Sequence, residues 1–308
     1  MQDPVSEKTP KKKIDVQSLI KRFSSTAFLW AVVAGVFCSH QLWVILLFIL
    51  GAAFIGVLEF NAITRDQPGR MKRKVTFFIS LFYMLWLGAD LLSLGGAENQ
   101  HAQESLNFAP EMIGILLTLL VTFLMSLPQE IKGANPIYSL GLGLLGFLYV
   151  PVLFGGFMMR LVFVAPDPEA SGAWLLLYLA LVTKFTDMGA YIMGTLFGRH
   201  KMIKHISPGK TWEGTIGSFL ISILGGFGVY YFAGSNLSWI GGWWSILSLS
   251  IIISFAAIIG DLAESILKRS VAVKDSGATL PGIGGILDLI DSLCFSAPIA
   301  YFYLVFFK

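Results

Sequence analysis

Acidic residues with helical spacing stand near the C-terminal end of this otherwise apolar chain. Asp288 and Asp291 are three residues apart, so on a helix their carboxylates share one face. Asp261, Ser265 and Lys268 follow the i, i+4, i+7 spacing, which is also a single face if that helix continues. Carboxylates beside phosphate suit Mg²⁺, which takes one or two carboxylates, several waters and phosphate oxygens. The pattern indicates a magnesium-dependent, phosphate-handling site; the alternative is a loop beside the membrane whose charges neutralise each other.

Cations and a glycine-rich turn accompany these acids. Lys268, Arg269 and Lys274 would supply the positive field that a polyphosphate needs. A Pro-Gly pair followed by two further glycines permits a tight turn whose backbone N–H groups lead into a helix N-terminus, which is a favourable anion site. The residues of this turn are Pro281, Gly282, Gly284 and Gly285.

A second polar stretch precedes the first. Its Asp187 lies within or at the end of an apolar helix, where an unpaired acid is costly. Ser207 is expected to cap a helix whose first turn contains Pro208. That helix would present Lys210 and Thr211 near its positive end. The stretch is not a Walker A loop, because the four-residue spacing between glycines is absent.

The composition requires a membrane around most of the chain. Of the 308 residues, 55% are hydrophobic and 13% are charged, and the mean hydropathy is +0.73. A soluble domain carries about 25% charged residues. The two cysteines lie in apolar runs, which excludes a disulfide framework and disfavours a structural zinc site. Because a spanning helix takes about 20 residues, the apolar runs predict about nine transmembrane helices, over residues 24–39, 41–60, 75–94, 111–127, 137–156, 172–197, 213–233, 243–260 and 285–306.

Basic residues predict the orientation of these helices. All but three of the 22 Lys and Arg residues fall on one side of the membrane; the exceptions are Arg160 and Lys308 on the other side and Lys184 within a span. For Lys184 we expect an ion pair between helices. The positive-inside rule then puts the N-terminus and two long polar loops, residues 198–212 and 261–284, in the cytoplasm.

These observations predict an all-α polytopic membrane protein with a cytoplasmic N-terminus and a polar site at its cytoplasmic face. We divide the chain into a basic N-terminal segment (1–23), N-terminal transmembrane helices (24–170) and a C-terminal catalytic transmembrane region with two cytoplasmic loops (171–308).

Together the two polar stretches resemble the phosphatidate cytidylyltransferase family (CDP-diacylglycerol synthases). TDMGAY, FGRHK and SPGKTWEG are similar to the family's ADxGAY, FGKxK and SPxKTxEG, and the resemblance covers roughly the C-terminal 130 residues in detail. Ile283 stands where the family usually has His, and Leu289 where it usually has Arg. The long family signature of Ser, Lys-Arg, Lys-Asp, Pro-Gly, Gly-Gly and two acids is matched by Ser265, Lys268, Arg269, Lys274, Asp275, Pro281, Gly282, Gly284, Gly285, Asp288 and Asp291.

The resemblance implies an enzyme of phospholipid biosynthesis that converts CTP and phosphatidate to CDP-diacylglycerol and pyrophosphate. It implies a multi-pass protein of a bacterial inner membrane, a homodimer, and contact with membrane lipid but not nucleic acid. By the same resemblance, Asp261, Asp288 and Asp291 would hold Mg²⁺, with a second cation left open. These three acids, Lys268 and Arg269 would form the catalytic set. Substrate-binding residues would be Ser207, Lys210, Thr211, Ser265, Lys274, Asp275, Gly284 and Gly285.

Three other functions stay open on the sequence. Ile283 and Leu289 favour a non-catalytic member that binds or scaffolds lipid, whereas the retained acids argue against it. A cytidylyltransferase for another lipid phosphate would have the same sequence features. A transporter is disfavoured, because the acids cluster at one face and not at the bilayer midplane.

Overall fold

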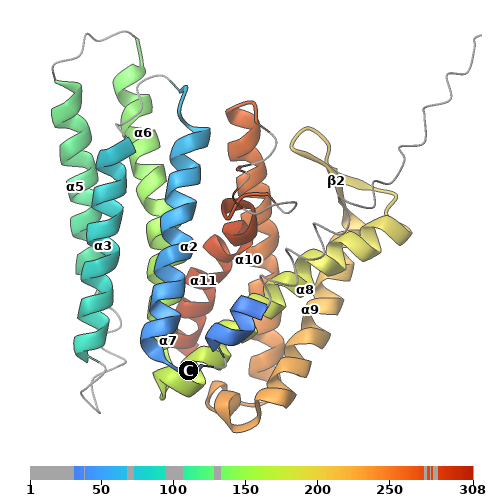
Figure 1. Cartoon of the computed structure of the whole chain (residues 1–308). Coiled ribbons are helices and arrows are strands. Elements are labelled where there is room, and N and C mark those ends of the chain that lie inside the picture. The colour runs from blue at the N-terminus through green and yellow to red at the C-terminus, as the bar shows by residue number, and fades with distance from the viewer. Residues whose placement is uncertain are drawn as a thin grey trace, which may run out of the picture.

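The chain is a bundle of long helices with one small β-hairpin (Figure 1). Within the described residues, eight helices are long and apolar enough to cross a membrane, which confirms the all-α polytopic class. The predicted basic segment 1–23 and most of the first predicted span, 24–39, lie outside the described part. The computed structural model describes residues 31–37, 39–67, 73–94, 107–127, 133–273, 276–277, 279 and 284–307.

The long helices of the N-terminal half form one side of the bundle, whereas the short helix over 31–37 lies beside the C-terminal half (Figure 1). It begins with a helix over 31–37 and continues with α2 (Leu42–Ile63), α3 (Arg73–Leu94), α5 (Ala109–Ser126) and α6 (Asn135–Phe147). A π-helical stretch, η1 (Leu148–Gly156), joins α6 to α7 (Phe157–Val164), so the three form one apolar span of 29 residues. Residues 157–171, which the predicted spans 137–156 and 172–197 leave as a connector, are therefore helical over their first half. Pro151, inside η1, cannot donate an α-helical hydrogen bond, and the wider π turn accommodates it.

Helix α7 also buries Arg160, which we expected at the membrane surface. The Arg160 and Glu111 side chains are only 1% and 4% exposed, and their closest charged atoms are 2.9 Å apart. The Tyr83 hydroxyl donates to the same carboxylate at 3.1 Å. A buried charge is tolerated when it is paired in this way. Arg160 therefore joins α7 to α5, and its charge is no evidence for the orientation of the helices in the membrane.

The C-terminal half carries the hairpin and the polar residues. A short π-helical segment, η2 (Pro168–Gly172), leads into α8 (Ala173–Phe197), which is followed by β1 (Lys201–Ile203) and β2 (Ser207–Thr211). The chain then returns through α9 (Trp212–Ala233), a 3₁₀ segment η3 (Gly234–Ile240), α10 (Trp243–Ser270) and α11 (Leu287–Phe307). Helix α8 packs along α9, and α10 packs along α11.

Two predicted boundaries in this half are wrong. Helix α10 continues ten residues past the predicted end at 260, so the predicted loop 261–284 begins only after Ser270. Hydropathy shows only where contact with lipid ends. Helix α10 itself continues, because the polar side chains beyond that point pair with residues of neighbouring elements. The predicted helix start at Ser207 is also wrong, since residues 207–211 form β2. Lys201 lies opposite Thr211, and Ile203 opposite Ser207, in an antiparallel pair.

The polar segments gather at one end of the bundle. The hairpin, the C-terminal end of α10 and the N-terminal end of α11 lie at that end, whereas α7 and the C-terminus lie at the other (Figure 1). Gly260 allows α10 to approach α11 there, because a Cβ at this position would lie 2.6 Å from the Asp291 carbonyl oxygen. The cytoplasmic orientation of this end stays a prediction.

Candidate active site

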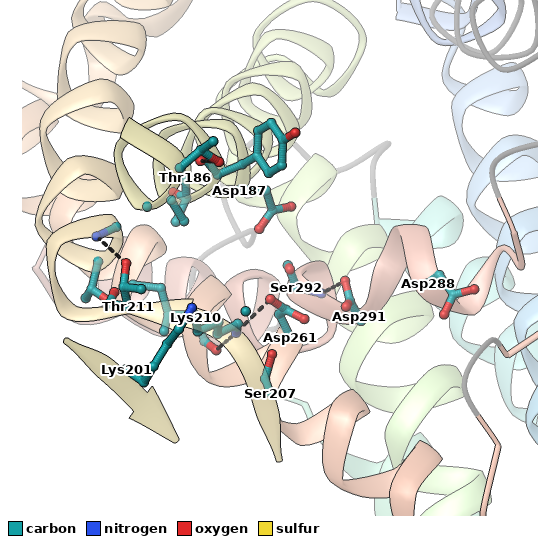
Figure 2. A pocket seen from close by; sticks show the side chains of 18 residues that line it. Thr186, Asp187, Lys201, Ser207, Lys210, Thr211, Asp261, Asp288, Asp291 and Ser292 are labelled. Carbon is teal, nitrogen blue, oxygen red and sulfur yellow. Dashed lines mark hydrogen bonds and ion pairs between the residues drawn. The ribbon is translucent and has the colours of Figure 1, made fainter. Parts of the chain in front are cut away.

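A cavity of about 630 Å³ lies between the hairpin and helices α8, α9, α10 and α11 (Figure 2). This volume is within the usual range of small-ligand sites, about 300–1,000 Å³. We call it the polar cavity, because charged and hydroxyl side chains dominate its lining. Its polar lining residues are Thr186, Asp187, Tyr191, Thr195, Lys201, Ser207, Lys210, Thr211, Thr215, Asp261, Asp288, Asp291 and Ser292.

The fold brings several predicted residues into this one cavity although they are far apart in sequence. The hairpin strand β2 contributes three, α10 one and α11 two (Figure 2). Asp187, the acid predicted within or at the end of an apolar helix, lines the cavity from α8. The predicted residues in the lining are Ser207, Lys210, Thr211, Asp261, Asp288 and Asp291.

Strand β2 places a cation and a helix N-terminus at the cavity wall. The Lys210 ammonium lies 2.6 Å from Oδ2 of Asp261 and so joins the hairpin to α10. Thr211 is the N-cap of α9, and its Oγ1 accepts a hydrogen bond of 3.1 Å from the Gly214 N–H. Gly214 and Thr215, in the first turn of α9, line the cavity. A helix N-terminus beside a lysine attracts phosphate.

Carboxylates from three helices share the cavity. Asp261 and Asp291 come together because Gly260 lets α10 and α11 touch, and Figure 2 shows Asp288 apart from them, in the first turn of α11. Asp187 faces the same space from α8. Like charges this close need a cation or a positive side chain between them.

The residues present fit a magnesium ion by their chemistry. Four aspartates line the polar cavity, and carboxylate oxygens are the ligands that Mg²⁺ prefers. Across the described residues, no three His, Cys, Asp or Glu side chains converge on one point as a complete metal cage. Mg²⁺ does not require such a cage, since it usually takes one or two carboxylates and completes its shell with water and phosphate oxygens.

Asp288 is held more firmly than the other acids of the lining. Its Oδ1 lies 2.9 Å from Nζ of Lys268. Its Oδ2 accepts hydrogen bonds from the N–H of Gly285 at 2.9 Å and of Ser276 at 3.4 Å. Lys268 itself does not line the cavity and also contacts Glu264, at 2.5 Å. Asp288 therefore has less capacity for a metal ion than Asp261 or Asp291.

The remaining predicted residues lie away from the cavity or outside the described part of the chain. Ser265 and Arg269 are on α10 beyond the lining, and Arg269 is exposed. Gly284, with a φ of 129°, and Gly285 form the backbone against Asp288. Predictions for the rest of this segment concern residues outside the described ones: Lys274, Asp275, Pro281, Gly282 and Ile283.

Two buried acids near the site were missed by the sequence reading. Glu264 contacts Lys268, and their i, i+4 spacing on α10 was the available signal. Glu59 lies in α2, accepts a hydrogen bond of 2.8 Å from the Leu287 N–H, and also accepts one from the Thr279 hydroxyl. It thereby ties α2 to the start of α11. An acid inside an otherwise apolar span was the signal for Glu59.

The expected inter-helix ion pair of Lys184 is wrong. Its carboxylate partner is Asp187 on the same helix, at 3.3 Å. The contact between helices is instead a hydrogen bond of 3.1 Å from Lys184 Nζ to the carbonyl oxygen of Leu289 on α11. The ammonium therefore lies between α8 and α11, close to the polar cavity.

Fold and site together define a polytopic membrane protein with a cavity of acids and lysines at its helix ends. The chain belongs to the cytidylyltransferase family, whose profile matches residues 20–307. A phosphatidate cytidylyltransferase of Haemophilus influenzae is 33% identical over 280 residues, which cover 88% of this chain and 94% of the relative.

Two further relatives match only part of the chain, at higher identity. The phosphatidate cytidylyltransferase of Staphylococcus haemolyticus is 44% identical over 131 residues, covering 42% of this chain and 49% of the relative. That of Staphylococcus aureus is 41% identical over 133 residues, covering 43% and 50%. The family resemblance is thus confirmed. The bacterial relatives and the eight apolar helices support the expected multi-pass protein of a bacterial inner membrane.

Proposed function

We propose that this protein is a phosphatidate cytidylyltransferase, which forms CDP-diacylglycerol and pyrophosphate from CTP and phosphatidate. The observation that carries the proposal is the polar cavity, where Asp187, Asp261 and Asp291 meet Lys210 at the ends of transmembrane helices. A lipid headgroup and a water-soluble nucleotide can both reach such a position. Family membership supports the same reaction.

The reaction requires alignment more than activation. An oxygen of the lipid phosphate attacks the α-phosphorus of CTP, a new P–O bond forms, and the bond to the β-phosphate breaks to release pyrophosphate. A phosphate monoester has a second pKa of about 6, so its oxygen is already anionic near neutral pH. No serine or histidine is needed to create the nucleophile. The protein must instead offset the repulsion between anions and hold them in line.

Residues of the hairpin and of α9 suit the triphosphate. Lys201 and Lys210 line the polar cavity, and the capped N-terminus of α9 adds backbone N–H groups beside them. Asp261 holds the Lys210 ammonium at the wall, so this charge is fixed before substrate arrives. Lys268 does not line the cavity and acts indirectly, by holding the Asp288 carboxylate.

We propose Asp261 and Asp291 as the carboxylates that would hold Mg²⁺, with Asp288 as a more restricted third. When bound, the ion would supply positive charge against the phosphates of CTP. Asp187, which pairs with Lys184, would orient that lysine. The homodimer expected from the resemblance remains a prediction, which light scattering of the purified protein in detergent can test.

The test measures pyrophosphate release from CTP by the purified protein in mixed micelles, with and without phosphatidate and Mg²⁺. We expect release only when both are present, and a loss of about 100-fold or more in Asp288→Asn. Asp66→Asn, a change at an exposed aspartate in the turn after α2, is the matched control and should retain activity. Absence of release from folded wild-type protein would overturn the phosphatidate reaction; release with another lipid phosphate would reassign the substrate.

A further inference from the structure

A second cavity, of about 290 Å³, is almost entirely apolar. Helices α2, α8 and α11, the η1–α7 span and the helix over 31–37 form its walls. Of the described side chains that line it, only Lys184 carries a charge. Its apolar lining includes Phe37, Phe48, Ala52, Phe154, Met158 and Leu293. We call it the apolar cavity.

The two cavities share two helices as walls. On α11, Asp288 and Asp291 face the polar cavity, whereas Leu289 and Leu293 face the apolar one. On α8, Asp187 lines the polar cavity and Lys184, one turn earlier, lines the apolar one. The apolar cavity is therefore adjacent to the polar one, with Lys184 at the boundary.

Lys184 is positioned to receive an anion at this boundary. Its Nζ lies 3.1 Å from the carbonyl oxygen of Leu289, and this contact fixes the ammonium against α11. Its pair with Asp187 is long, at 3.3 Å, and the two side chains are 30% and 36% exposed. A phosphate at this boundary would replace Asp187 as the anionic partner of the ammonium, which the Leu289 carbonyl keeps in place.

We propose that the apolar cavity holds an acyl chain of the lipid substrate and that Lys184 binds the phosphate of the same lipid. This inference rests on the proposed function and specifies how that site takes its lipid. A substrate with an apolar tail and an anionic head matches an apolar cavity with one cation at its polar boundary. The head then lies beside Asp187 and Asp291, next to the space proposed for CTP.

The acyl-chain part is tested by filling the apolar cavity. Ala52→Leu on α2 and Ala180→Leu on α8 each add three carbons to the lining. We expect kcat/KM for dioleoyl phosphatidate to fall about tenfold, because several methylenes lose their apolar surroundings, while kcat/KM for dihexanoyl phosphatidate changes less than about twofold. Ala62→Leu, at an exposed position of α2 outside both cavities, is the matched control and should keep both values. Equal behaviour of all three variants would overturn the acyl-chain assignment.

The phosphate part is tested at Lys184. We expect Lys184→Met to raise KM for phosphatidate by about 10–100-fold, the loss of one charged hydrogen bond, with KM for CTP nearly unchanged. Lys184→Arg should restore most of the affinity for phosphatidate, which a purely structural lysine would not require. A rise in KM for CTP instead, or no change in either constant, would overturn the assignment of Lys184.

A measurement on the wild-type protein removes dependence on variants that fail to fold. Phosphatidate with a photoreactive group in its acyl chain should cross-link within residues 48–52 of α2 or 286–293 of α11. Excess dioleoyl phosphatidate should suppress the cross-link. Cross-links confined to residues outside the lining of the apolar cavity would show that the acyl chain binds elsewhere. That result, or no cross-link at all, would overturn the proposal. Failure of the reaction itself would instead appear as wild-type protein without lipid-dependent pyrophosphate release.

Discussion

The Lys210 ammonium and the Asp261 carboxylate meet at 2.6 Å between the hairpin and α10. Both side chains are partly exposed, so their pairing stabilises the fold by only about 0–1 kcal/mol. The pair matters more for where it holds a positive charge, at the wall of the polar cavity and one residue before the cap of α9.

Replacing Lys210 should therefore reduce activity without unfolding the protein. We expect Lys210→Gln to lower kcat/KM for CTP by about 10²–10³-fold, the usual effect of losing one fixed donor to a charged substrate. The midpoint of thermal unfolding should shift by less than about 4 °C. Lys204→Gln, an exposed lysine of the same hairpin turn, serves as control. A similar loss in both variants would indicate that the general charge of the hairpin matters and not the position of Lys210.

The contact between α10 and α11 should not tolerate a larger residue at Gly260. A Cβ there would lie 2.6 Å from the Asp291 carbonyl oxygen and 2.8 Å from Cα of Ser292, and backbone atoms cannot move aside cheaply. We expect Gly260→Ala to destabilise the protein by about 1–3 kcal/mol and to reduce activity as Asp261 and Asp291 separate. Thermal unfolding and pyrophosphate release measure the two effects.

Gly228→Ala on α9 is the matched change, since a Cβ at that position meets no atom of the described residues within 4 Å. It should leave stability unchanged or raise it by about 0.5–1 kcal/mol through helix propensity. Equal losses in both variants would show that the close approach at Gly260 has no special importance.

The carboxylate of Glu59 should stabilise the start of α11. It accepts hydrogen bonds from the Leu287 N–H and from the Thr279 hydroxyl, and its removal leaves the buried Leu287 N–H without this acceptor, whereas the exposed Thr279 hydroxyl can turn to solvent. We expect Glu59→Ala to cost about 1–3 kcal/mol for the one buried donor left unpaired and to lower kcat, because the start of α11 positions Asp288. Glu169→Ala, at an exposed glutamate of η2, should have no effect on either quantity. Full activity in Glu59→Ala would exclude this positioning role.

Removing divalent cations should abolish the reaction. Four aspartates and the phosphates of the substrates would share one cavity, and this charge requires a cation. We expect EDTA to stop pyrophosphate release and Mg²⁺ to restore it, with Ca²⁺ a poor substitute because it is larger and prefers more ligands. Asp291→Asn should need a higher Mg²⁺ concentration for half-maximal rate, whereas Asp66→Asn should not. Undiminished release in EDTA would rule out the magnesium proposal.

The buried pair of Arg160 and Glu111 should behave as a structural unit remote from the site. We expect Arg160→Met to cost about 3–5 kcal/mol, because Glu111 is then left as a buried charge without its main partner. Arg160→Met combined with Glu111→Met should cost less than the single change, which a double-mutant cycle by thermal unfolding measures. Additive effects of the two substitutions would contradict the coupling.

The class of fold and much of the lining of the site could be read from local patterns. Apolar runs of about 20 residues place the helices, because a helix in lipid must satisfy its own backbone. The three-residue spacing of Asp288 and Asp291 already put both on one face of α11, and both line the polar cavity. The end of α10 and the strand that begins at Ser207 could not be predicted, because hydropathy reflects only contact with lipid. It carries no information on the hydrogen bonds that extend α10 past residue 260 or that pair β1 with β2.

The sequence by itself therefore determined that the chain spans a membrane, which residues share a helix face, and to which family the chain belongs. What only the tertiary structure decided is which distant residues meet. Glu59 reaches Leu287 across most of the chain, and Lys184 reaches the carbonyl of Leu289 on another helix. Such contacts depend on how closely two helices approach and at what rotation, as at Gly260, and helix packing is set by the whole set of facing side chains. Local spacing records only which residues share a face.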